Sequence, residues 1–319
     1  MEAIHRDSPQ AGPTPARDMR RRRRRRTATE RSELRLALLF LAPAVLIYAV
    51  FMLAPSVIAV YYSLTDWNGV SAVKHFVGLD NFKAMIHDDR IVSALGHNLM
   101  FVVVGTFATI AIGLVLAVLL WGRPRLGGTY RLAIFVPFTL PIVIVGIVWG
   151  WIYNPLYGSL NAALGSLGLE SLEKGWLGDS STALPALVAA QSWALIGFVV
   201  VLLLAGLQNV DTDLIDASQI DGARWHNRLK DVILPQIAPV MTMVAALILT
   251  YGFQVFDIVF VTTDGGPGTS TEVLGTYAYR AAFRQNEIGY GTAISLVMAV
   301  LSILVAVVFV SLRERRHHV

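Results

Sequence analysis

The sequence predicts an all-α membrane protein with six transmembrane helices. Hydrophobic residues make up 55% of its 319 residues and charged residues only 15%, whereas soluble globular proteins average about 25% charged residues. The apolar residues fall into six blocks, each close to the ~20 residues that a helix needs to cross the hydrocarbon core of a bilayer. These blocks are residues 36–62, 98–121, 132–153, 183–207, 239–262 and 290–312.

The distribution of Lys and Arg predicts how these spans are oriented. Of the 26 Lys and Arg residues, 20 lie in segments on the side of the bilayer that holds both termini, and 6 lie on the other side. The acidic residues show no such bias, with eleven on the first side and ten on the second. Because Lys and Arg accumulate in cytoplasmic segments, we expect a multi-pass protein of the plasma membrane with both termini in the cytoplasm.

The chain begins with an arginine-rich segment, residues 1–33, that is expected to be a disordered cytoplasmic tail. Its few apolar groups cannot offset the entropy lost on ordering. The run from Arg20 to Arg26 adjoins the first span, and such a run fixes topology more often than it binds nucleic acid. We therefore expect membrane lipid, and no nucleic acid, as a partner. Residues 34–312 are predicted to form the six-helix transmembrane domain, and residues 313–319 a short cytoplasmic tail.

Prolines within two spans predict kinked helices packed in a bundle. The first span contains Pro43 and Pro55, and the third contains Pro137 and Pro141. Proline removes a helical hydrogen bond, and a bilayer tolerates the freed carbonyl only where a neighbouring group satisfies it. Prolines are also common in membrane helices, so no site is assigned to them.

Three segments are expected on the outer side, at residues 63–97, 154–182 and 263–289. The third contains the turn cluster Asp264-Gly265-Gly266-Pro267-Gly268, in which glycines can supply positive φ angles. We expect these segments to be structured rather than to act as flexible tethers.

The segment between the fourth and fifth spans, residues 209–238, is too regular for a disordered linker. Asp211 or Thr212 can cap a first helix, whose early turns carry further acidic groups that the helix dipole favours. Gly222 can end that helix in a left-handed conformation. The segment therefore predicts a helix that stops at a glycine corner.

A second helix is expected to run from about Ala223 to Pro235 on the cytoplasmic surface. The two helices offer five apolar anchors, which are Ile215, Ile220, Trp225, Leu229 and Val232. Such a pair can dock into a groove on another protein, or it can rest on lipid headgroups as an amphipathic hairpin. The residues of this segment leave both interpretations open.

The spacing in this segment resembles the EAA loop of the membrane subunits of binding-protein-dependent ABC importers. The pattern of that loop is Glu-Ala-Ala, two residues, Asp-Gly-Ala, an apolar position and Ile-x-Leu-Pro. The matching positions here are Asp216, Ala217, Ser218, Asp221, Gly222, Ala223, Leu229, Leu234 and Pro235. The departures are Asp216 for Glu, Ser218 for the second Ala, Leu229 for the usual Phe, and Val232 for Ile. The external motif from Phe76 to Phe82 and the sequence Thr263-Asp264-Gly265-Gly266-Pro267 are similar to the carbohydrate-importer branch of that family.

This resemblance implies a type I importer permease that is not itself an enzyme. Its loop would form coupling helices seated in a cleft of a cytoplasmic ATPase, with Asp216 as the charged docking residue and Gly222 as the corner. The implied partners are a second permease subunit, an ATPase dimer and an extracytoplasmic solute-binding protein. ATP would be used by the partner ATPase, and no cofactor is expected in this chain. The implied solute is a sugar, with a sugar derivative such as glycerol phosphate as the alternative.

Polar residues inside the fifth span are the first candidates for a substrate pathway, because intramembrane polar groups are costly. Thr250, Gln254 and Asp257 recur at three- and four-residue spacing and so would share one face of a continuous helix. Tyr251 adds an aromatic plane, which together with hydrogen-bonding groups suits a sugar. Trp193 in the fourth span, beside Gln191 and Ser192, forms a second candidate. The alternative is that these groups hold neighbouring helices together.

Two other functional classes fit the composition less well. A secondary transporter could use Asp257 as an ion-coupled carboxylate, but it would not need a docking loop. A membrane enzyme is disfavoured because no Gly-Lys pair of a phosphate-binding loop, no His-Glu-x-x-His and no Gly-x-Ser-x-Gly motif occurs. The seven histidines are scattered and cysteine is absent, so we expect no metal site and no disulfide.

Overall fold

The computed structural model describes residue 33 and residues 36–122 and 127–315. The predicted tail over residues 1–33 lies outside the described residues except for Glu33. Of the predicted carboxyl-terminal tail, only Arg313 to Arg315 are described, and they continue the last helix. Across the two long described stretches the chain is helical, and its only strand-like pairing is a single antiparallel bridge between Thr65 and Phe76.

The chain divides into two units, residues 1–58 and residues 59–319. The described part of the first unit is helical from Leu36 onward and contains the π-helical turn η1, Ala49–Leu53. Helix α2, Ala54–Ser63, carries this helix into the second unit. Together these residues form one apolar helix of 28 residues, Leu36–Ser63, at the position of the first predicted span.

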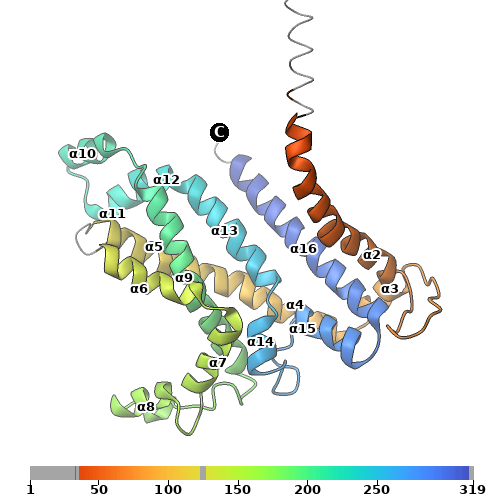
Figure 1. The fold of residues 1–319 in the computed structure, drawn as a ribbon. Coiled ribbons are helices and arrows are strands. Elements are labelled where there is room, and N and C mark those ends of the chain that lie inside the picture. The colour runs from red at the N-terminus through yellow and green to blue at the C-terminus, as the bar shows by residue number, and fades with distance from the viewer. Residues whose placement is uncertain (1–32, 34–35, 123–126, 316–319) are drawn as a thin grey trace, which may run out of the picture. The chain divides into compact units, whose positions relative to one another are not determined.

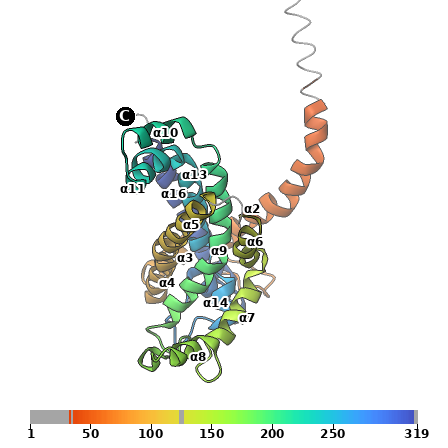
Figure 2. The same ribbon diagram turned by 90° about the vertical axis from the view of Figure 1, so that its left-hand side faces the viewer.

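The second unit is a bundle of helices (Figures 1 and 2). Its elements up to the fourth span are α3 Asp80–Ile86, α4 Asp89–Met100, η2 Phe101–Gly105, α5 Thr106–Trp121, α6 Gly127–Thr139, α7 Ile142–Ile152, α8 Ser159–Ser166, η4 Glu170–Leu172 and α9 Ala183–Leu207. The elements that follow are α10 Thr212–Ile220, α11 Trp225–Arg228, η5 Leu229–Ile233, α12 Leu234–Gln236, α13 Ala238–Phe253, α14 Asp257–Thr262, α15 Leu274–Tyr279, η6 Arg280–Arg284 and α16 Ile288–Arg315.

The helices provide four spans by length and composition, and six if each of two bent pairs counts as one span. The four straight spans are Leu36–Ser63, Asp89–Trp121, Ala183–Leu207 and Ile288–Arg313. The bent pairs are Gly128–Thr139 with Ile142–Ile152, at 99°, and Trp225–Gln236 with Ala238–Phe253, at 73°. The six predicted apolar blocks therefore all correspond to helices, but two of them are not simple rods.

The third span breaks at Leu140 and Pro141, where the sequence predicts a kink. Pro141 has extended backbone angles and precedes the first residue of α7, and a proline disfavours the helical conformation of the residue before it. Pro137, by contrast, lies inside α6 without ending it. Only one of the two prolines therefore interrupts the helix, and it does so far more sharply than a kink.

The prediction of one continuous fifth span over residues 239–262 is wrong. Helix α13 ends at Phe253, and α14 begins at Asp257. The carbonyls at the end of α13 are bonded by the side chain of Asn98 on α4 instead of by a further helical turn. A tertiary contact here overrides the local preference for helix.

Helix α9 lies at the centre of the bundle and packs against α5, α6, α7 and α13 (Figures 1 and 2). Sixteen of its 25 residues are buried. Glycines allow close crossings: a β-carbon at Gly197 would meet the backbone of α6, and one at Gly252 of α13 would lie 2.9 Å from the Cα atom of Val102. Small residues at helix crossings are typical of membrane bundles, where close packing replaces the hydrophobic driving force.

Candidate functional site

Two features of the second unit stand out, and they lie at different levels of the bundle. One is the corner formed by α10 and α11, at the end of the bundle opposite to α8 (Figure 1). The other is a cavity among α6, α7, α9, α13 and α14.

Helix α10 starts where the sequence predicts a cap. Asp211 has an extended backbone, and its Oδ1 atom accepts a hydrogen bond of 2.9 Å from the backbone N–H of Asp213. The first N–H groups of a helix have no partner within the helix, so this bond satisfies one of them. The carboxylate of Asp213 also lies in the first turn, which the helix dipole favours.

The glycine corner closes α10 as predicted. Gly222 has a φ of +78°, its N–H donates to the carbonyl of Gln219 at 3.0 Å, and the N–H of Ala223 donates to the carbonyl of Ser218 at 2.9 Å. These two bonds define a Schellman motif. No atom lies within 4 Å of a β-carbon built on Gly222. The position therefore requires glycine for its backbone conformation and not for lack of space.

The second helix runs from Trp225 to Gln236 and then bends by 73° into α13. Its predicted bounds, Ala223 to Pro235, are within two residues of those observed. Gln236 ties the two ends of the segment together, because its Oε1 atom accepts a hydrogen bond of 2.9 Å from the backbone N–H of Asp211. The corner is thus fixed to the start of the fifth span.

The corner has an inner and an outer face. On the inner face Ile215, Leu229 and Leu234 pack against the apolar core formed by α5, α9 and α13. The outer face exposes 52% of Leu214 and 87% of Ile220. Asp216 is also exposed, and its Oδ1 atom accepts a hydrogen bond of 3.3 Å from Gln219.

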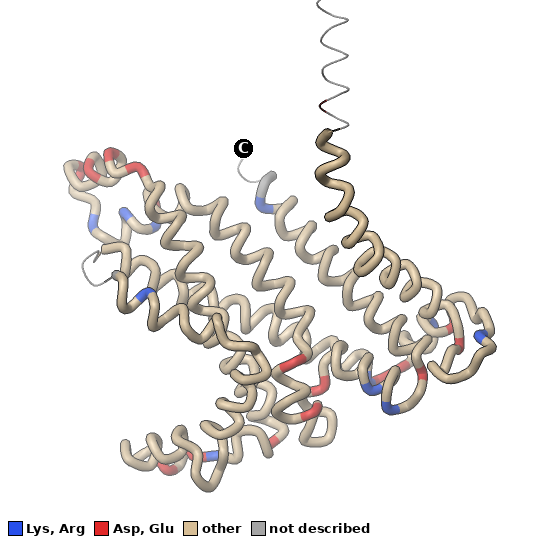
Figure 3. Tube along the Cα trace, viewed as in Figure 1, with Lys and Arg blue, Asp and Glu red and all other residues tan. Residues whose placement is uncertain are grey.

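Charge on this corner is strongly divided between its two helices (Figure 3). Carboxylates cap and line α10, whereas the segment that follows has more basic than acidic residues. The acidic residues of the first part are Asp211, Asp213, Asp216 and Asp221, and the second part carries Arg224, Arg228 and Lys230 with one carboxylate, Asp231. The outer face of α10 therefore presents apolar side chains among negative charges.

The cavity forms where the two broken spans face the middle of α9. It has a volume of about 310 Å³ and is lined by Phe138, Leu140, Ile142, Gln191, Ala194, Leu195, Tyr251, Gln254, Val255, Phe256, Asp257 and Ile258. The break between α6 and α7 contributes the residues around Leu140. The break between α13 and α14 contributes those around Val255.

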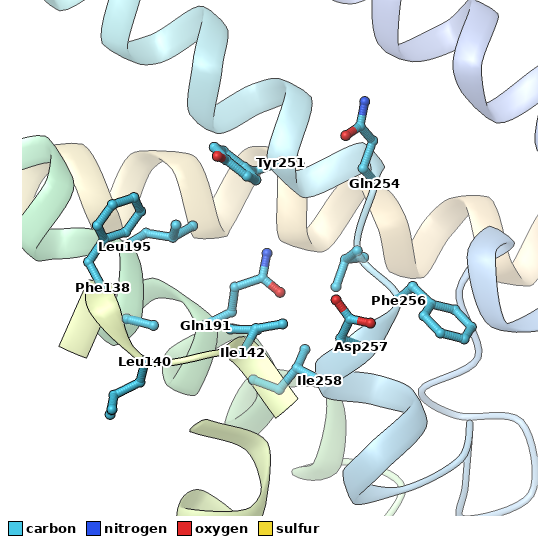
Figure 4. A pocket seen from close by; sticks show the side chains of 12 residues that line it. Phe138, Leu140, Ile142, Gln191, Leu195, Tyr251, Gln254, Phe256, Asp257 and Ile258 are labelled. Carbon is cyan, nitrogen blue, oxygen red and sulfur yellow. The ribbon is translucent and has the colours of Figure 1, made fainter. Parts of the chain in front are cut away.

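Polar side chains from two different spans meet in this cavity. The Gln191 amide and the Asp257 carboxylate point toward one another, whereas the Gln254 amide points away from this pair (Figure 4). An amide beside a carboxylate offers both donors and acceptors, and Phe138 and Tyr251 add aromatic surface. This combination of apolar walls with a few convergent polar groups is typical of sites for small polar molecules.

The sequence-predicted pathway residues are divided by the structure. Tyr251, Gln254 and Asp257 line the cavity, but they do not share one helix face, because the helix breaks between Gln254 and Asp257. Thr250 does not line the cavity. Its hydroxyl donates to the carbonyl of Ala246 within α13 at 2.9 Å. Trp193 also lies outside the lining and packs edge to face against a neighbouring tryptophan at 5.6 Å between ring centroids.

The cavity also contains residues that the sequence did not single out. Phe138 and Leu140 belong to the break at Pro141, and that proline was the available signal. Asn98 bonds the end of α13 beside the cavity without lining it, and no local signal marks it because it stands at the edge of a predicted span.

The turn cluster Asp264 to Gly268 is held by two ion pairs from η6. Arg284 donates to both carboxylate oxygens of Asp264, at 2.7 and 3.2 Å. Arg280 lies 3.0 Å from the carboxylate of Glu272, and it donates to the carbonyl of Asp264 at 2.9 Å. Burial raises the pKa of Glu272 above its ordinary value, and the charge of Arg280 partly opposes that rise. The predicted structured turn is confirmed, with Gly265 at a φ of +90°.

Comparisons with known proteins place these features in context. The family described as "binding-protein-dependent transport system inner membrane component" matches residues 109–318. The diacetylchitobiose uptake system permease protein of Streptomyces coelicolor is 33% identical over 84% of this chain and 79% of its own length. The multiple sugar-binding transport system permease protein of Streptococcus mutans is 30% identical over 86% of this chain and 94% of its own.

A solved structure shows the same fold. A chain from a bacterial ABC transporter involved in the import of the acidic polysaccharide alginate superimposes with a TM-score of 0.76. The match covers 92% of this chain and 99% of that chain, at 20% sequence identity. The two chains therefore share the same arrangement of helices.

Proposed function

The chain belongs to the family of binding-protein-dependent transport system inner membrane components, and from this premise we propose that it is the permease subunit of an ATP-driven importer for a neutral carbohydrate. Two similar proteins are named for the uptake of diacetylchitobiose and of multiple sugars. The permease would form part of the translocation pathway in a multi-pass membrane complex.

The observation that carries the choice of solute is the composition of the cavity. Its twelve described lining residues include one carboxylate, two amides and several aromatic rings, but no Lys or Arg. Hydroxyl groups pair well with carboxylate and amide groups. A phosphate ester would instead meet the Asp257 carboxylate without a compensating cation. The cavity thus favours a sugar over glycerol phosphate, the alternative from the sequence.

The α10–α11 corner would couple ATP hydrolysis by the partner ATPase to conformational change at this cavity. The outer face of α10 offers Leu214 and Ile220 to an apolar groove, and Asp216 to a basic group of a cytoplasmic ATPase. Such a carboxylate would form a charge-assisted hydrogen bond with an arginine. Five other residues of the EAA-like pattern have structural roles: Ser218, Gly222 and Ala223 build the corner, and Leu229 and Leu234 fix it to the core.

The proposed assembly contains this chain, a second permease subunit, an ATPase dimer and an external solute-binding protein. The α10 end would face the cytoplasm together with both termini. The loop after Thr263, which Arg280 and Arg284 hold in place, would face the binding protein. The stiffness of that loop supports this role, because a preformed surface loses little conformational entropy when a partner binds.

The test is reconstitution of the purified complex in proteoliposomes with ATP inside. A panel of maltose, diacetylchitobiose and glycerol 3-phosphate, each with the co-purified binding protein, would be followed by uptake of radiolabelled solute. ATP-dependent uptake of a neutral sugar is expected. Uptake of glycerol 3-phosphate alone, or uptake driven by an ion gradient without ATP, would contradict the proposal.

A further inference from the structure

The break between α13 and α14 leaves backbone groups that need hydrogen-bond partners. A helix end leaves its last carbonyls unbonded within the helix, and a helix start leaves its first N–H groups unbonded. Inside a membrane bundle no bulk water is present to satisfy them, and each unsatisfied group is costly. The end of α13 and the start of α15, which packs against the break, are both buried: the exposed fraction is 2% for Phe253 and 1% for Leu274.

One side chain, that of Asn98, bonds both the end of α13 and the start of α15. The Nδ2 group of Asn98 donates to the carbonyls of Gly252 and Phe253, at 3.3 and 3.1 Å, and these are the last carbonyls of α13. Its Oδ1 atom accepts from the N–H of Leu274, the first residue of α15, at 2.8 Å. An asparagine amide has two N–H donors and one acceptor oxygen, so every group is used. Asn98 is itself fully buried, with 0% exposure.

The surrounding packing brings these elements into reach of Asn98. A β-carbon on Gly252 would lie 2.9 Å from the Cα atom of Val102, so α13 and the second span touch at the backbone. A β-carbon on Gly275 would lie 3.0 Å from the carbonyl of Val255, so α15 abuts the break. His97, the neighbour of Asn98, also bonds this region, with its Nδ1 atom 2.7 Å from the carbonyl of Glu272.

We propose that Asn98 is a positioning residue of the transport cavity, which holds open the break in the fifth span and thereby places Val255 and Asp257 in the cavity wall. It acts through the backbone of α13 and α15 and does not touch the solute. Its effect on import rests on the proposed function, whereas its effect on the geometry of the break does not.

The geometric part is tested with a single thiol at the break. The chain contains no cysteine, and Val255 is 4% exposed, so a Val255→Cys thiol would be shielded in the native bundle. With Asn98→Leu in addition, α13 loses both capping bonds and the break frays. Alkylation of the thiol by a water-soluble maleimide in the complete complex is expected to accelerate about tenfold. The free-energy cost of one unsatisfied buried polar group corresponds to about a tenfold change in the equilibrium between the closed and the frayed break.

The matched control is Asn161→Leu. Asn161 is also buried, at 8% exposure, and it bridges Trp176 and the carbonyl of Lys174 at 2.7 and 3.0 Å, away from the cavity lining. This change is expected to leave the alkylation rate of the Val255→Cys thiol within about twofold. Equal acceleration in both variants would mean a general loss of stability and would overturn the proposal.

Asn98→Asp provides a second variant should Asn98→Leu fail to assemble. It keeps an acceptor for Leu274, but even as a neutral acid it has only one O–H donor for the two carbonyls of α13, so accelerated alkylation is again expected. An unchanged alkylation rate in this variant would overturn the proposal. Sugar uptake by the unmodified complex is measured in parallel. If that complex takes up no sugar while alkylation is accelerated in the Asn98 variants, the positioning role of Asn98 stands and the proposed function is rejected.

Discussion

Asp257 is the residue on which the solute-binding part of the proposal depends most directly. It is the one carboxylate among the described residues that line the cavity, and it faces Gln191 from the opposite wall. Replacing Asp257 with Leu removes an acceptor and leaves Gln191 facing an apolar group, so we expect sugar uptake to fall by about tenfold or more. Asp257→Asn keeps an acceptor and should retain more activity.

The control for this prediction is the neighbouring Thr250, whose hydroxyl bonds within its own helix. Thr250→Val should leave sugar uptake near the level of the unmodified importer. If uptake falls as far in Thr250→Val as in Asp257→Leu, the cavity is not the pathway and the face predicted from spacing alone regains support.

The second prediction concerns Gly222. Its backbone conformation is one that other residues rarely adopt. A left-handed conformation costs roughly 1–2 kcal/mol for a residue with a side chain, and more for a β-branched one. Gly222→Val should therefore distort the corner and lower solute-stimulated ATP hydrolysis by the assembled complex, while uptake falls in parallel.

Gly168 is a matched control for that change. It has a φ of +73°, and no atom lies within 4 Å of a β-carbon built there, as at Gly222. Gly168→Val introduces the same kind of backbone strain in the predicted external segment. Its stimulated ATPase activity should stay near normal; if both variants lose it equally, backbone strain alone explains the loss and the corner has no special part in coupling.

At the scale of elements, local and non-local determinants of structure separate clearly. The α10–α11 corner could be predicted from sequence because its determinants, a capping aspartate and a positive-φ glycine, lie within the segment itself. The break in the fifth span could not, because the side chain that stabilises it lies 154 residues away in sequence from the carbonyl of Gly252. Tyr251, Gln254 and Asp257 therefore line a cavity, but the continuous helix face that the spacing predicts is interrupted by the break.

The loop from Thr263 to Val273 contains Glu272, whose titration is expected to make the thermal stability of the protein depend on pH. The pKa of Glu272 is raised in the folded protein, chiefly by burial. A raised folded-state pKa means that the linked stability is present at acidic pH and is lost as pH rises through the folded pKa. The thermal unfolding temperature should thus decline as pH rises from about 4.5, the usual range of this carboxyl.

Glu272→Gln isolates this contribution, because the amide keeps the shape of the neutral acid and does not titrate. The decline in unfolding temperature over this pH range should be smaller in the variant by roughly 2–4 °C for each 1 kcal/mol of linked free energy. The measurement is a thermal scan of the purified complex at several pH values. An identical pH profile in both proteins would assign the decline to other groups.

At the scale of the whole second unit, one stretch of chain joins the proposed docking surface to the proposed solute site. The helix Trp225–Gln236 bends directly into α13, and α13 ends at the break that forms the cavity wall. Leu229 and Leu234 fasten this stretch to the core near one end, and Asn98 fastens it at the other. A movement of the corner would therefore reach the cavity through two successive helices that are anchored at both ends, as rigid-body switching requires.

That coupling scheme requires the α10 corner and the external loops to lie on opposite sides of the membrane, and the absence of cysteine makes this testable. Thr212 on α10 and Ser171 after α8 are both exposed, and each can be changed to the single cysteine of the chain. Because the Lys and Arg bias puts the α10 side in the cytoplasm, a membrane-impermeant maleimide should label Ser171→Cys in intact cells and Thr212→Cys only after permeabilisation. The ratio of labelling before and after permeabilisation is the measurement, with import activity confirming that each variant is assembled. The reverse pattern would invert the topology and place Asp216 out of reach of a cytoplasmic ATPase. Labelling of both positions in intact cells would put both on the outer face, and the corner could then not couple ATP hydrolysis to import.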